Sequence, residues 1–197
     1  GSPGMIDTKL FNMSLAGMCI FIFLLYADKM IEYPLEPWII EKFGESQFYL
    51  FSFFIILGIF FNIAGFVLGT FILKKYSRKS LLFFFSLLCG ISEILFAFVD
   101  FISFLLLMGV VQIMAGIITI NLTSIMLDFA NLTGNKVVYT QILVFFFSLS
   151  VVIFVPLGTI LSHFVPTELI FIISGILLIF SLIPLSQVKL SQLNLKN

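Results

Sequence analysis

The sequence is poor in charged residues. Only 10% of its 197 residues are charged, whereas soluble domains carry about 25%. Its two cysteines lie far apart without a Cys-x-x-Cys spacing, which favours small buried hydrophobes over a disulfide framework. No esterase, zinc-protease or phosphate-loop motif occurs, so nothing predicts an enzyme, a cofactor or a metal site. No basic face interleaved with aromatics indicates nucleic-acid binding.

Apolar residues are abundant, and they are arranged in blocks of membrane-spanning length. They make up 61% of the chain, including 27 phenylalanines. A bilayer core about 30 Å thick needs roughly 20 apolar residues per helix. We therefore predict an all-α polytopic membrane protein, a bundle of six transmembrane helices. The expected helices are 12–30, 47–73, 80–99, 101–127, 137–163 and 168–185.

The six helices are expected to form one transmembrane domain over residues 5–197. The tetrapeptide Gly1–Gly4 precedes Met5 and is interpreted as an expression-tag scar, so it is excluded from the fold.

Lysine and arginine are distributed unevenly between the two sides of the predicted bundle. Eight fall on the side of the N-terminus, and only Lys29 and Lys42 fall on the other. Because cytoplasmic loops carry the excess of Lys and Arg, we expect an integral protein of the cell inner or plasma membrane with both termini cytoplasmic. The eight are Lys9, Lys74, Lys75, Arg78, Lys79, Lys136, Lys189 and Lys196.

Three carboxylates are candidates for coupling transport to an ion. Ionisable groups within a membrane are costly, so each is a functional hypothesis by default. Asp28 lies near the outer end of the first helix, and Glu32 follows at i+4 on the expected same face. Glu93 lies among apolar residues of the third helix. The alternatives are a hydrated interfacial end for Asp28 and Glu32, and a protonated, hydrogen-bonded Glu93.

Four amide side chains fall within predicted spans, and they could line a substrate cavity or join helices by hydrogen bonds. They are Asn62, Gln112, Asn121 and Gln141. Pro156 and Gly158 predict a kink or flexible point in the fifth helix.

The connection after the second helix carries a family resemblance. The stretch Thr70–Lys79 reads Thr-Phe-Ile-Leu-Lys-Lys-Tyr-Ser-Arg-Lys. With six helices and both ends inside, it resembles the N-terminal half of a major facilitator superfamily transporter, whose loop signature reads Gly-x-Leu-x-Asp-Arg-x-Gly-Arg-Arg/Lys. Lys75, Arg78 and Lys79 match basic positions of the signature, whereas Lys74 replaces the Asp. The resemblance implies a conformational loop at Lys74, Lys75, Arg78 and Lys79.

The resemblance also implies partners. In the superfamily the path lies between two six-helix halves, so this chain would need a second half or a homodimeric copy. A truncated or split chain, a homodimer and a half that has lost transport all remain open. Gln112 stands where the family often has an Arg in an Arg-xxx-Gly pattern, which argues against an Arg-based proton mechanism.

The expected function is transport of a small solute across the bilayer, coupled to protons or another cation. The alternative is a non-transporting membrane scaffold or accessory subunit, in which Glu93 and Gln112 would be satisfied within the bundle.

Overall fold

The computed structural model describes residues 6–197, so the expected scar at Gly1–Gly4 lies outside the described residues. The described part of the chain is all-helical and contains no strand, which confirms the all-α prediction. Its elements are α1 (Thr8–Leu25), η1 (Ala27–Ile31), α2 (Leu35–Phe43), α3 (Glu45–Ile72), α4 (Arg78–Leu95), α5 (Phe101–Thr133), α6 (Lys136–Leu161), α7 (Thr167–Phe180), α8 (Leu182–Ser186) and η2 (Ser191–Leu193).

Short polar side chains mark where several of these helices begin. The side chains of Asp7, Ser77, Asp100 and Asn135 each accept a hydrogen bond from the backbone N–H three residues later. Each bond satisfies one of the free amides of a first helical turn. Gly134 ends α5 in the left-handed conformation, with φ +71°, which glycine adopts without steric cost.

Five helical stretches are long and apolar enough to cross a membrane. They are Thr8–Ile31, Glu45–Ile72, Phe101–Thr133, Lys136–Leu161 and Thr167–Leu193. The sequence predicts six spans, and the sixth segment is present as the 18-residue helix α4. Helix α4 is only 18 residues long and contains three charged residues, Arg78, Lys79 and Glu93, so no stretch of membrane-spanning length within it has fewer than three charges.

Several helix bounds differ from the prediction. The first expected helix, 12–30, is α1 followed by the 3₁₀ helix η1, with the change of geometry at Tyr26. Helix α5 continues to Thr133 rather than ending at 127. The short helix α2 lies outside the six predicted segments, because nine residues with only Trp38 and Ile39 buried are too short to register as a span.

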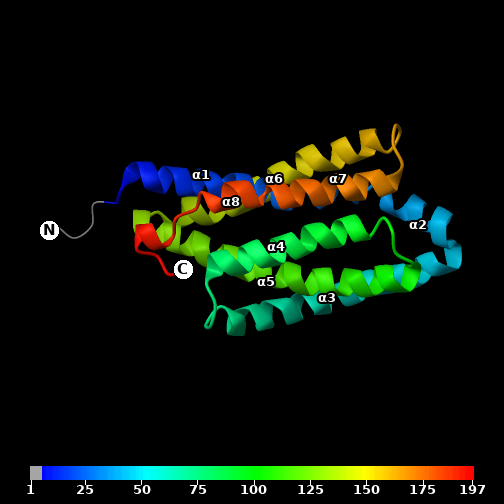
Figure 1. Ribbon diagram of the computed structural model, residues 1–197, viewed down its shortest axis with the longest axis horizontal. Helices are drawn as coiled ribbons and strands as arrows, with labels where there is room; N and C mark the ends of the chain where they lie inside the picture. The colour runs from blue at the N-terminus through cyan, green and yellow to red at the C-terminus, as the bar shows by residue number, and fades with distance from the viewer. Residues whose placement is uncertain (1–5) are drawn as a thin grey trace.

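The helices run back and forth between two ends of the bundle (Figure 1). One, here called the basic end, holds the start of α1, the α3–α4 turn, the α5–α6 turn and the C-terminal segment. It contains eight of the ten lysines and arginines. The opposite end, here called the α2 end, holds η1, α2 and the α4–α5 and α6–α7 turns. The chain therefore enters and leaves the bundle at the same end.

Small residues allow the closest helix contacts. Helix α3 packs along α5, where Gly65 lies against Gly116. A Cβ atom at Gly65 would overlap the carbonyl oxygen of Ile113, and one at Gly116 would overlap that of Asn62. The glycines therefore allow this close packing, as expected for helices that associate without a hydrophobic driving force.

Helix α6 meets η1 at the pair of residues for which a kink is predicted. The helix is continuous from Lys136 to Leu161 and contains Pro156. Gly158, one turn from the end of α6, lies directly against the backbone of Met30, and a Cβ atom there would overlap the Met30 carbonyl. Gly158 thus sets how closely η1, which carries Asp28, approaches α6.

The buried apolar side chains form two clusters along the bundle. The cluster toward the basic end includes Phe21, Leu122 and Phe129, and the cluster toward the α2 end is rich in aromatic residues, including Phe104 and Phe171. Val111 packs against both clusters. The polar residues described next lie at this boundary.

Candidate functional site: a carboxylate cavity

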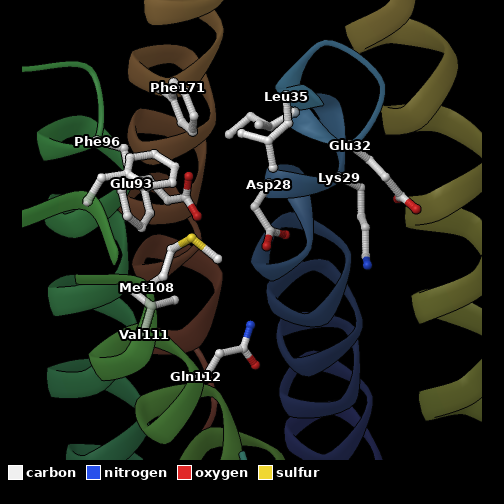
Figure 2. Close-up of a pocket in the computed structure, with 12 residues that line it drawn as sticks. Asp28, Lys29, Glu32, Leu35, Glu93, Phe96, Met108, Val111, Gln112 and Phe171 are labelled. Atoms are coloured by element: carbon white, nitrogen blue, oxygen red, sulfur yellow. The ribbon is translucent and has the colours of Figure 1, made fainter. Parts of the chain in front are cut away.

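A cavity of about 190 Å³ opens between η1, α4 and α5 (Figure 2). Five polar side chains line it: Asp28 and Lys29 from η1, Glu32 at the end of η1, Glu93 from α4 and Gln112 from α5. Apolar side chains complete its walls, namely Ile31, Leu35, Phe96, Phe104, Met108, Val111 and Phe171. The fold therefore brings the three predicted ion-coupling carboxylates and one predicted amide to one cavity.

Glu93 is buried without a complete set of partners. Its side chain is only 6% exposed, and among the described residues its Oε2 atom has no hydrogen-bond partner. Four buried polar side-chain atoms share this condition, and Glu93 is the only ionisable residue among them. Figure 2 shows its carboxylate near Phe96 and Phe171, directed toward the side of the cavity where Asp28 lies. A proton, a water molecule or a ligand in the cavity must therefore satisfy it.

Asp28 faces Glu93 from the opposite wall. It lies in η1, where α1 has given way to 3₁₀ geometry, and its side chain is exposed to the cavity (Figure 2). Both carboxylates also line a second cavity of about 70 Å³ on the side of the basic end. The pair thus stands where two cavities meet.

Glu32 lines the same cavity as Asp28, but its side chain does not point toward Glu93. The i+4 argument assumes 3.6 residues per turn, but η1 is a 3₁₀ helix with three residues per turn. Glu32 is three residues after Lys29, so it lies one 3₁₀ turn beyond Lys29 on the same side. Figure 2 shows the side chains of Lys29 and Glu32 pointing away from Glu93. The Lys29 Nζ atom lies 5.8 Å from the centre of the Phe147 ring on α6, so this cation is drawn away from the two carboxylates.

The second cavity contains polar residues that sequence reasoning missed. Tyr26, Cys89 and Thr119 line it together with Asp28 and Glu93. One signal was available for Thr119, because it lies seven residues after Gln112 and so on the same helix face. A similar signal was available for Cys89, which lies four residues before Glu93 on α4. Tyr26 lies between α1 and η1, where the change of helix geometry removes such a signal.

Of the four amide candidates, the structure places only Gln112 at the cavity. Asn62 instead donates a hydrogen bond to the Gln112 carbonyl at 3.3 Å, which joins α3 to α5. Asn121 is fully buried and donates to the carbonyl of Arg78 at 2.8 Å. Gln141 is exposed on α6 and is not among the residues that line either carboxylate cavity. Helix-to-helix bonding, the alternative explanation, applies to Asn62 and Asn121.

The predicted conformational loop divides into exposed and bound residues. Lys74 and Lys75 are exposed in the α3–α4 turn. Arg78 is not a loop residue, because it begins α4 and is only 3% exposed. Its guanidinium pairs with Asp128 at 2.6 Å, donates to the Ser124 hydroxyl at 2.9 Å, and donates from both Nε and Nη2 to the carbonyl of Lys196.

The partner Asp128 was missed because the predicted helix ended at residue 127. With α5 extended to Thr133, Asp128 lies on the helix one turn after Ser124 and reaches Arg78. The spacing of Ser124 and Asp128, four residues apart, places a hydroxyl and a carboxylate on one face of a helix. That spacing could have indicated a binding site for a basic residue.

Lys79 ties the same end of α4 to the C-terminal segment. Its Nζ atom donates to the carbonyls of Ser186 at 3.2 Å and Val188 at 2.8 Å, at the end of α8. A cation there complements the free carbonyls and the negative end of the helix dipole. Arg78 and Lys79 together bind the chain's last residues onto the bundle.

The cavity has the groups for binding or passing a positive charge. Three carboxylates, one amide and one cation line it, and the ammonium of that cation, Lys29, lies 5.8 Å from the centre of the Phe147 ring on α6. Within residues 6–197 no group of three or more His, Cys, Asp or Glu side chains is placed to hold a metal ion.

Comparisons with protein-family models, with curated proteins and with solved structures found no match to this chain.

Proposed function

We propose that the protein is a membrane transporter that moves a small solute and couples its movement to protons or another cation. The observation that carries the proposal is the unpartnered carboxylate of Glu93 at a cavity it shares with Asp28 and Gln112. A buried carboxylate without a partner is costly in a membrane, and such residues characteristically belong to ion pathways and proton relays.

The scaffold alternative makes a different prediction for the same atoms. In a purely structural bundle, Glu93 and Gln112 would be satisfied by neighbouring helices. Asn62 and Arg78 do follow that rule. Glu93 does not, so the site supports transport over a passive subunit.

The proposed architecture is the six-helix half of a major-facilitator-like transporter, with α4 as the sixth span. It is supported by the single long bundle, by the two chain ends lying at one end, and by the eight basic residues there (Figure 1). On the positive-inside rule the basic end is cytoplasmic. The proposal includes a second six-helix half or a homodimeric copy, because one half offers only part of a path.

The test is transport in proteoliposomes under an imposed pH gradient, with internal pH followed by an entrapped dye. A library of small solutes is applied to wild type, Glu93→Gln and the matched control Glu41→Gln, which removes an exposed carboxylate on α2 outside the cavity. We expect solute-dependent proton flux in wild type and the control, and its loss in Glu93→Gln.

Two outcomes would count against the proposal. Equal flux in folded Glu93→Gln would remove Glu93 from the coupling step. Absence of flux for every solute in folded wild type, with native mass spectrometry showing a strict monomer, would favour the scaffold alternative.

A further inference from the structure

The charges around the cavity identify the sign of its occupant. Three carboxylates, Asp28, Glu32 and Glu93, line the cavity with a single cation, Lys29, whose ammonium lies over the Phe147 ring rather than between Asp28 and Glu93. Since Glu93 is 94% buried and its Oε2 atom has no partner, a ligand that brings a positive charge and N–H donors would satisfy it.

The walls identify the rest of the occupant. Phe96 has its ring centre 4.8 Å from that of Phe104 and 5.7 Å from that of Phe171, so three aromatic rings form one continuous wall beside the carboxylates. Met108 and Val111 add further apolar surface. Aromatic faces attract organic cations and also accept apolar groups.

The volume limits its size. A cavity of about 150 Å³ lined by apolar side chains is enough to bind benzene. The cavity here measures about 190 Å³, which leaves room for one ring-sized group with an amine attached.

An inorganic cation fits these surroundings poorly. Calcium takes six to eight oxygen ligands, and magnesium requires near-ideal octahedral geometry. Asp28, Glu32, Glu93 and Gln112 supply oxygen atoms to the cavity, but among the described residues no three carboxylates are placed to hold one metal ion, and the apolar part of the lining is aromatic or aliphatic. An organic ammonium ion needs fewer oxygens because its body replaces water with apolar contacts.

We infer that the cavity binds a small organic ammonium ion, with its amine between Asp28 and Glu93 and its apolar body against Phe96, Phe104 and Phe171. As a substrate class, this inference rests on the proposed transport function. As a binding site, it can be tested without transport.

The experiment is isothermal titration calorimetry of the purified protein in detergent with three probes of one shape. Benzylamine is cationic, benzyl alcohol is neutral and benzoate is anionic. We expect benzylamine to bind, benzyl alcohol to bind at least about tenfold more weakly, and benzoate to give no binding signal. This comparison requires no variant, so it stands even if a substitution impairs folding.

Variants then locate the site. Glu93→Gln and Asp28→Asn should each weaken benzylamine binding at least about tenfold, because each leaves the ammonium with one carboxylate. Glu41→Gln, which removes the same charge outside the cavity, should leave binding unchanged. Equal affinity for benzylamine and benzyl alcohol, or unaltered binding by folded Glu93→Gln, would overturn the inference.

A flux assay separates this inference from the proposed function. Benzylamine binding that depends on Glu93 but produces no flux of any solute would retain the site and refute transport. Proton-coupled flux of another solute, without benzylamine binding, would retain transport and refute the ammonium site.

Discussion

Helix α4 carries two buried ionisable residues that the protein treats in opposite ways. Arg78 at the basic end is 3% exposed, and Glu93, about four turns later, is 6% exposed. Arg78 has a carboxylate, a hydroxyl and a backbone carbonyl as partners, whereas Glu93 has an unpartnered oxygen at a cavity. Burial of a charge therefore does not by itself indicate a functional site; what distinguishes the two residues is whether the bundle supplies their partners.

The difference has a physical reason in the neighbours of each residue. Near Arg78, the end of α5 and the C-terminal segment supply oxygen atoms that are not needed for helix bonding. Near Glu93, the neighbouring turns of α4, α5 and α7 supply aromatic and aliphatic side chains to the cavity, with Gln112 as the exception. A structural role suits the first environment, and exchange with a ligand or proton suits the second.

The largest expected effect comes from breaking the Arg78 cluster. Arg78→Ala removes the ion pair with Asp128 and three further hydrogen bonds. Breaking a fully buried pair costs about 3–5 kcal/mol, and because the Asp128 side chain is 33% exposed we expect roughly 2–3 kcal/mol. The measurement is reversible unfolding in mixed micelles.

The control for this change is Lys75→Ala, which removes an exposed basic residue three positions earlier. It should alter the free energy of unfolding by less than about 0.5 kcal/mol. If both substitutions had equal effects, the partners of Arg78 would not be the source of its stabilisation.

A smaller effect is expected from Gly158→Ala. The added Cβ atom would overlap the Met30 backbone, so η1 must shift, and overpacking of this kind costs about 1–3 kcal/mol. Because η1 carries Asp28, we also expect weaker benzylamine binding. Thermal unfolding and calorimetry measure the two effects.

Gly109→Ala is the matched control for Gly158→Ala. A Cβ atom there would meet only the Phe61 ring, at 3.6–3.9 Å, which is an ordinary van der Waals contact. It should preserve stability or raise it by up to about 1 kcal/mol, since alanine favours helix more than glycine does. A loss of stability as large as that of Gly158→Ala would show that the close approach to Met30 is unimportant.

Glu93→Gln should change the free energy of unfolding in the opposite direction to Arg78→Ala. Replacing an unpartnered buried carboxylate with a neutral amide should raise the free energy of unfolding by about 1 kcal/mol, while abolishing coupled flux and weakening amine binding. Thermal melts of the wild type and the variant at equal detergent concentration give the sign. A clear loss of stability would mean that the Glu93 carboxylate is held by partners within the bundle.

The smallest effect concerns Asp100 at the start of α5. Hydrogen bonds from the Ser103 side chain and backbone N–H, the latter at 2.8 Å, hold the pKa of Asp100 below its ordinary value of 3.8. Since the folded-state pKa is the lower one, this stabilisation is complete well above pH 4 and is lost as the pH falls through the folded pKa. The melting temperature of Asp100→Ala should therefore lie slightly below wild type at neutral pH. The two should converge in acid, and a difference independent of pH would contradict this.

The helices could largely be predicted from the sequence, because a long apolar segment in a bilayer forms a helix. The helix ends and faces were harder to predict where an apolar segment changes helix type or contains a charged residue. Tyr26 ends α1 within an apolar block, and η1 then has three residues per turn. Glu32 therefore lines the same cavity as Asp28 but points away from Glu93. The stop predicted at residue 127 also hid Asp128, the partner of Arg78.

The candidate site could be predicted only in part. Glu93 and Asp28 stand out in any apolar segment, because an ionisable group there is costly. Nothing in their spacing says that they face one cavity, since they lie 65 positions apart in the chain with helices α2 and α3 between them. The amides illustrate the same limit, because Asn62, Gln112 and Asn121 look alike in sequence and only Gln112 faces the cavity.

The sequence by itself determined that this is an all-helical chain with membrane-length apolar helices and with its basic residues concentrated at one end. Hydrophobic length and charge distribution are local properties, and they act on each segment separately. Only the tertiary structure decided which buried charges are satisfied, where the cavities lie and which residues share them. Those outcomes depend on contacts between segments far apart in the chain, such as Gly158 with Met30 and Arg78 with Asp128.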